Sequence, residues 1–193
     1  NYLVFDYLAE VTMSILAASQ MKNPDLGYAT DFISQTGPLL SEIKAQGIKV
    51  ISNAGGINPI ACRKALIKEA DKQGLNFKIA IVEGDNLFHQ KDDFFKKRVK
   101  DIDTNSDIPK SVTSINAYLG AEPIRRALDE GADIIITGRC VDSAVTLGPL
   151  MYEFGWKLTD YDLLAAGSLA GHIIECGAQC NGGNFTDWHL VKD

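Results

Sequence analysis

The chain has 193 residues, is 46% hydrophobic and carries a net charge of −6. This length suits one domain with a full hydrophobic core, and we expect a single α/β domain over residues 1–193. The acidic balance argues against nucleic-acid binding, because phosphate contacts need clustered Lys and Arg. The sequence has no apolar run of about 20 residues and no basic leader, so neither a membrane span nor secretion is expected.

Four cysteines are present, at Cys62, Cys140, Cys176 and Cys180. They are sparse and unevenly spaced, which is not typical of a disulfide framework. We therefore expect a cytoplasmic protein, or one in another reducing intracellular compartment.

The first half of the chain alternates apolar strand-like runs with helical patterns. The expected elements are a strand over 2–5, helices over about 8–21 and 38–45, a strand over 48–52 and a helix over 58–73. The breaks between them are marked by Asn23-Pro24, Gly47 and Gly74, and Pro59 suits the first position of its helix.

The second half adds further strands and helices around a polar excursion. We expect strands over 77–82, 112–115 and 132–137, and helices over about 92–100, 123–131, 143–154 and 160–176. The stretch 86–110 is rich in Asp, Lys and Asn and is predicted to leave the domain body. Continuous apolar strands between helices predict a mostly parallel sheet flanked by helices, doubly wound, with a partial β/α barrel as the alternative.

Small and polar residues follow each predicted strand, where parallel α/β folds bind ligands. The candidate ligand-binding residues are Asn53, Gly55 and Gly56 after the second strand, and Gly138, Arg139 and Ser143 after the last. Glycines before a helix allow close approach to an anion, and Arg adds a fork of donors for carboxylate or phosphate. The alternative is that both glycine pairs only form tight turns. Neither loop has the spacing of a Walker or dinucleotide motif.

Acidic side chains at the same strand ends are candidates for acid–base catalysis. They are Glu83, Asp85 and Asp142, together with Asp6 and Glu10 after the first strand. The alternative is that they cap helices or pair with Arg139.

His172 is a further acid–base candidate, in a segment that also contains Cys176 and Cys180. That spacing matches no standard zinc site, so we expect no metal, and the sequence identifies no cofactor. Cys140 and Cys176 have no evident base to activate them as nucleophiles.

These motifs are similar to those of the acyclic terpene utilisation (AtuA) family. The similar segments are 6–10, 52–59, 82–85, 116–120, 137–143 and 163–179, continuing through 182–185 to 187–188. Family members carry a further N-terminal strand and continue past Trp188. The resemblance therefore implies that the chain is a fragment lacking an N-terminal strand and a C-terminal part.

The family is associated with breakdown of branched acyclic terpenes such as citronellol, alongside acyl-CoA carboxylation. The resemblance implies an enzyme acting on a branched acyl-CoA or related carboxylate, with a small anionic metabolite as its ligand. The alternative is a non-catalytic binding or assembly subunit of an acyl-CoA-processing complex, and we expect a homo-oligomer. Nucleotide binding is a third hypothesis, because a glycine-rich strand edge also suits a mononucleotide.

Overall fold

A four-stranded parallel sheet forms the centre of the protein in the computed structural model, which describes residues 1–181 and 187–190. The strands are β1 (Tyr2–Phe5), β2 (Lys49–Ser52), β3 (Ile79–Val82) and β4 (Ile134–Thr137), in the spatial order β1-β2-β4-β3. Ile135 of β4 pairs with Ile51 on one side and Ala80 on the other. Within the described residues the sheet is open, which decides against the barrel alternative and confirms the α/β prediction.

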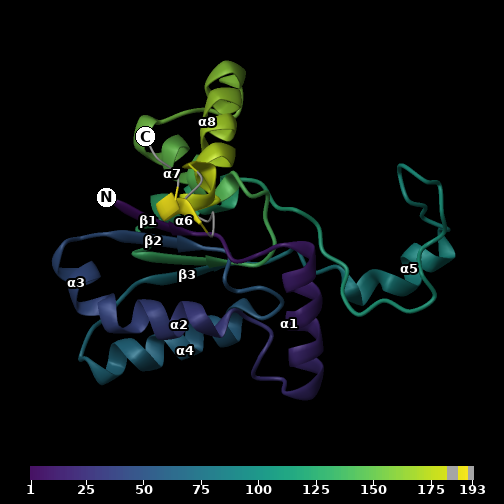
Figure 1. Ribbon diagram of the computed structural model, residues 1–193, viewed down its shortest axis with the longest axis horizontal. Helices are drawn as coiled ribbons and strands as arrows, with labels where there is room; N and C mark the ends of the chain where they lie inside the picture. Colours follow the sequence, from purple (N-terminus) through teal and green to yellow (C-terminus); the bar gives the residue numbers. More distant parts are fainter. Residues whose placement is uncertain (182–186, 191–193) are drawn as a thin grey trace.

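Helices cover both faces of this sheet, as Figure 1 shows. The helices are α1 (Glu10–Lys22), α2 (Thr30–Thr36), α3 (Leu40–Ala45), α4 (Pro59–Lys72), α5 (Lys91–Lys96), α6 (Glu122–Asp129), α7 (Ala144–Phe154) and α8 (Tyr161–Ile174). Short 3-10 helices span Gly37–Leu39, Phe88–Gln90, Gly177–Asn181 and Trp188–Leu190. Helices α2, α3 and α4 lie below the sheet in Figure 1, and α6, α7 and α8 lie above it. Helix α5 belongs to the polar excursion on the right.

The alternation of side chains along the strands divides the core into two layers. Val50 and Ile134 pack with Phe32 and Leu66 on the face covered by α2 and α4. The neighbouring residues Ile51 and Ile135 point to the opposite face, against Ile124, Leu128 and Val145 of α6 and α7. All four residues of β4 are buried, which explains why this strand is a continuous apolar run.

Two predictions of local structure are wrong. Helix α2 was not predicted, because its seven residues are too few to show a clear helical period, although Phe32 and Thr36 are buried one turn apart. The segment 112–115 is no strand. This segment does not pair with the strands of the sheet. Directly after it, Asn116 forms an isolated antiparallel bridge with Asn86.

Candidate functional site

The strand ends that follow β2, β3 and β4 bring polar residues to one edge of the sheet, here called the carboxyl edge. Asn53, Asp85 and Arg139 follow these three strands and are all buried, with Arg139 only 3% exposed. Because β4 lies between β2 and β3, Arg139 occupies the middle of this edge.

The guanidinium of Arg139 connects several parts of the chain. Its Nη1 donates to the carbonyl oxygens of Leu8 at 3.0 Å and Cys140 at 3.1 Å, and to Oδ1 of Asp142 at 2.7 Å. Its Nη2 donates to Oε1 of Glu10 at 3.3 Å. The side chain of Arg139 is 4% exposed, whereas that of Glu10 is 75% exposed. The buried cation is therefore held by the half-buried carboxylate of Asp142 and by that of Glu10, which faces solvent.

Tyr118 covers the guanidinium from a separate loop. Its ring centroid lies 4.1 Å from Cζ of Arg139, and its hydroxyl donates to Glu10. The hydrogen bond from Tyr118 lowers the pKa of Glu10, and Arg139 lowers it further. Burial acts to lower the pKa of Arg139, but hydrogen bonds to Tyr118 and Asp142 raise it, so the guanidinium stays charged. Among the described residues, Nε of Arg139 has no hydrogen-bond partner.

Asp85 holds the loop that presents Arg139. Its Oδ2 accepts hydrogen bonds from the backbone N–H of Arg139 at 2.8 Å and from Nδ2 of Asn116 at 2.9 Å. A side chain at Gly138 would place its Cβ 2.6 Å from the carboxyl carbon of Asp85. Gly138 is thus required by the position of this carboxylate, and Asp85 has a clear role in fixing the loop.

Asn53 joins the ends of β1 and β2. Its Oδ1 accepts from the N–H of Tyr7 at 2.7 Å, and its Nδ2 donates to Oδ1 of Asp6 at 2.5 Å. The same oxygen of Asp6 accepts from the N–H of Leu8 at 3.1 Å. Since Leu8 is also a partner of Arg139, these bonds set the position of the first loop relative to the guanidinium.

Gly55 and Gly56 pack tightly inside the protein. A Cβ at Gly55 would lie 2.5 Å from the carbonyl oxygen of Thr137, and Gly56 adopts a φ of 55°. The first turn of α4 is capped by Asn58, whose Oδ1 accepts from the N–H of Ala61 at 3.2 Å. Gly55 is therefore required by close packing and Gly56 by the turn, as expected from the alternative that these glycines form a tight turn.

The other sequence candidates lie around this centre. Glu83 is exposed on the outer side of β3 and lines a shallow pocket with α6. Ser143 is buried, and a Cβ at Gly171 of α8 would lie 3.1 Å from its own Cβ. His172 is exposed in the last turn of α8. Asp85, Asp142 and Arg139 are therefore brought together, while Glu83 and His172 remain at the periphery.

A family model described as acyclic terpene utilisation family protein AtuA matches residues 1–193. The chain belongs to the AtuA family. Membership implies a role in acyclic terpene utilisation. No curated protein and no solved structure matched the chain. The AtuA-like motif residues 182–185 lie outside the residues that the structure describes.

The described residues of this AtuA-family chain also bear on membrane insertion, on thiol reactivity and on metal binding. In the described ranges, no helix is long and apolar enough to cross a membrane. Burial raises the pKa of Cys140 to about 11 and that of Cys62 to about 12, so neither forms a thiolate nucleophile near neutral pH. A hydrogen bond to Glu175 raises the pKa of Cys176. Residues 1–181 and 187–190 contain no group of three or more His, Cys, Asp or Glu placed to hold a metal ion.

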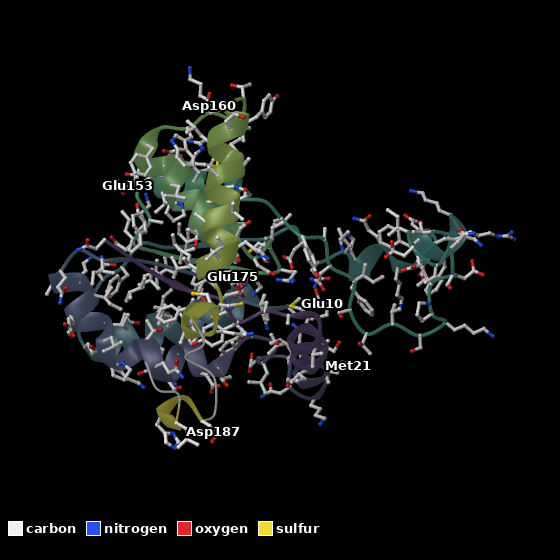
Figure 2. All side chains as sticks on the ribbon, turned by 45° about the horizontal axis from the view of Figure 1, so that its top comes forward. Glu10, Met21, Glu153, Asp160, Glu175 and Asp187 are labelled. Carbon is white, nitrogen blue, oxygen red and sulfur yellow. The ribbon has the colours of Figure 1, made fainter. Side chains whose placement is uncertain are left out.

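A pocket of about 280 Å³ lies beyond the carboxyl edge, between α1 and the segment 111–114. Its lining is Ala17, Gln20, Met21, Ile57, Asn86, Phe88, Ser111, Val112, Thr113 and Ser114. Asn86 directly follows Asp85, so this mainly apolar pocket adjoins the loop that supports Arg139. In Figure 2, Met21 marks the far end of α1 and Glu10 marks its start at the edge.

Proposed function

We propose that this AtuA-family chain is an enzyme of acyclic terpene or branched-chain acyl-CoA catabolism. Its ligand is an anionic acyl-CoA or carboxylate, bound at the carboxyl edge of the sheet. Family membership supports the metabolic setting. The observation that carries the proposal is the exposed Glu10 carboxylate on Nη2 of the buried Arg139.

The two ends of the Arg139 guanidinium differ in how firmly they are held. Nη1 is saturated by two backbone carbonyls and by Asp142. Nη2 donates to Glu10 at the longer distance of 3.3 Å, and the side chain of Glu10 is 75% exposed. A ligand carboxylate or phosphate has the same acceptor chemistry as Glu10. It can therefore take this position without leaving the cation unpaired.

Asp142 is the carboxylate best placed to act on a ligand bound there. Asp142 binds Nη1 of the guanidinium whose Nη2 would hold the ligand anion in place of Glu10. The side chain of Asp142 is 36% exposed. Asp85 is 3% exposed, and its Oδ2 accepts from the N–H of Arg139 and from Nδ2 of Asn116, which supports a positioning role. On this proposal Asp142 exchanges a proton with the substrate, while Arg139 orients the substrate's anionic group.

A ligand panel tests the proposal on the full-length protein. Citronellyl-CoA and citronellate are expected to raise the melting temperature through mass action, whereas ATP is not. Mass spectrometry of the same incubations would then reveal the product of turnover. The proposal fails if neither anion shifts the melting temperature, and a shift with ATP alone would favour the nucleotide hypothesis.

A second candidate function, assembly within a complex, is supported by helix α8. Leu163, Leu169 and Ile173 are 45%, 62% and 53% exposed and lie on the outside of this helix. The small residues Gly167 and Gly171 pack within the chain, against Trp156 and Ser143, so the outer face is left for a partner.

Analytical ultracentrifugation distinguishes this candidate from a self-contained enzyme. Leu169→Glu is expected to dissociate a homo-oligomer, whereas Val11→Glu, at a residue 72% exposed on α1, leaves the size unchanged. A wild-type protein that sediments as a monomer and turns over substrate unaided would contradict the assembly role.

A further inference from the structure

A second pocket, of about 410 Å³, lies beside the edge strand β1, against α7 and the end of α8. Its lining includes the aliphatic side chains of Val4, Pro149, Leu150 and Ile174 and the polar groups of Thr146 and Glu175. Tyr2 also borders it, but its hydroxyl donates to Oε1 of Glu153 at 2.5 Å. The volume is in the range of small-molecule sites, and the wall is mainly apolar.

Glu175 is the carboxyl group that lines this pocket. Figure 2 shows it at the end of α8 nearest the sheet. Its carboxyl lies beside that of Asp6, and its Oε1 accepts a hydrogen bond from the thiol of Cys176 at 3.2 Å. Asp6 in turn accepts an N–H of Asn53 at 2.5 Å.

The surroundings of Glu175 are negatively charged. Its burial, the carboxyl of Asp6 and the charge of Asp142 all raise its pKa. The polar end of the pocket thus presents the carboxyl group of Glu175, with those of Asp6 and Asp142 behind it. A ligand that carried its own carboxylate into this position would face repulsion from Asp6 and Asp142.

We propose that this pocket binds an uncharged ligand with an apolar chain and a terminal hydroxyl. The ligand hydroxyl donates to a carboxyl oxygen of Glu175 and accepts from the hydroxyl of Thr146, while the chain packs against Val4, Leu150 and Ile174. The inference goes beyond the proposed function, because the ligand is neutral and the site is distinct from the anion position on Arg139.

Calorimetric titration with octan-1-ol and with octanoate at neutral pH tests the inference on the whole chain. Octan-1-ol is expected to bind this pocket at least about tenfold more tightly than octanoate, and octanoate bound at Arg139 is recognised because Val4→Phe leaves it unchanged. Val4→Phe fills the pocket and is expected to weaken octan-1-ol binding by about tenfold or more. Val11→Phe, the same change on the exposed face of α1, is expected to leave binding unchanged.

Three results would overturn the inference. They are no octan-1-ol binding to the wild type, octanoate binding that is as tight as octan-1-ol binding and is weakened by Val4→Phe, and equal octan-1-ol binding to Val4→Phe and the wild type. If Val4→Phe fails to fold, Thr146→Val removes the donor hydroxyl with little change of shape and must weaken octan-1-ol binding. Octan-1-ol carries no anion, so a failure of anion binding at Arg139 leaves this result standing, and the two proposals fail separately.

Discussion

Replacing Arg139 by Lys keeps the buried charge but removes the planar fork of donors. Arg139 donates to four acceptors and stacks on Tyr118 at 4.1 Å. A lysine ammonium is a point donor that reaches at most three acceptors and loses the stacked plane. The lost contacts include buried carbonyl partners, so we expect Arg139→Lys to lower the free energy of unfolding by about 1–3 kcal/mol.

Thermal and urea unfolding measure this loss. For a chain of this size, each kcal/mol corresponds to a fall in melting temperature of about 2–4 °C. Arg125→Lys is a matched control, because Arg125 pairs with Glu122 and Asp129 on the surface of α6 and should cost at most about 1 kcal/mol. Equal small losses for both variants would refute the buried bracing role of Arg139.

Three further predictions concern neighbouring groups. Gly138→Ala brings a Cβ to 2.6 Å from the carboxyl carbon of Asp85 and should lower stability by about 1–3 kcal/mol in urea unfolding; an unchanged midpoint would contradict this. The pKa of Glu175 is raised in the folded state above the ordinary carboxyl value of 4.5, so the folded state binds more protons than the unfolded state. The free energy of unfolding therefore falls as the pH rises from 4.5 through the raised pKa. Glu175→Gln should abolish that loss in urea midpoints measured across this range, and identical pH profiles would argue against it. With iodoacetamide at neutral pH, exposed Cys180 should react faster than Cys140, whose pKa is about 11, as peptide mass spectrometry would show; faster labelling of Cys140 would contradict its burial.

The sheet could be predicted from the sequence because its buried strands are continuous apolar runs. The run ending at Thr137 is buried at every position, and the helices on both sides have clear breaks at glycine. The predicted strand over 112–115 failed because an apolar run does not reveal whether a neighbouring strand is present to pair with it. Helix α2 was missed because its burial depends on contacts with α4, which the pattern of its own seven residues does not reveal.

The place of Arg139 at the carboxyl edge could be predicted because it closely follows the end of β4. The residues that bind its guanidinium could not be predicted. Glu10 was identified only as one of several carboxylates after the first strand, and Tyr118 only as part of a loop. Their contacts with Arg139 join residues separated by 129 and 21 positions, which no local pattern specifies. Likewise, sequence could not separate a ligand-binding glycine from a packing glycine, because the difference lies in whether protein atoms fill the space beside Gly55.

The central claim, that a ligand anion replaces Glu10 on Nη2 of Arg139, is tested most directly by one set of binding isotherms. Citronellyl-CoA would be titrated into the full-length wild type, Glu10→Gln and Arg139→Lys. Glu10→Gln should bind more tightly, because the competing carboxylate is gone, and Arg139→Lys should bind more weakly by about 1–3 kcal/mol. Equal affinities for all three proteins, or weaker binding to Glu10→Gln, would contradict the claim.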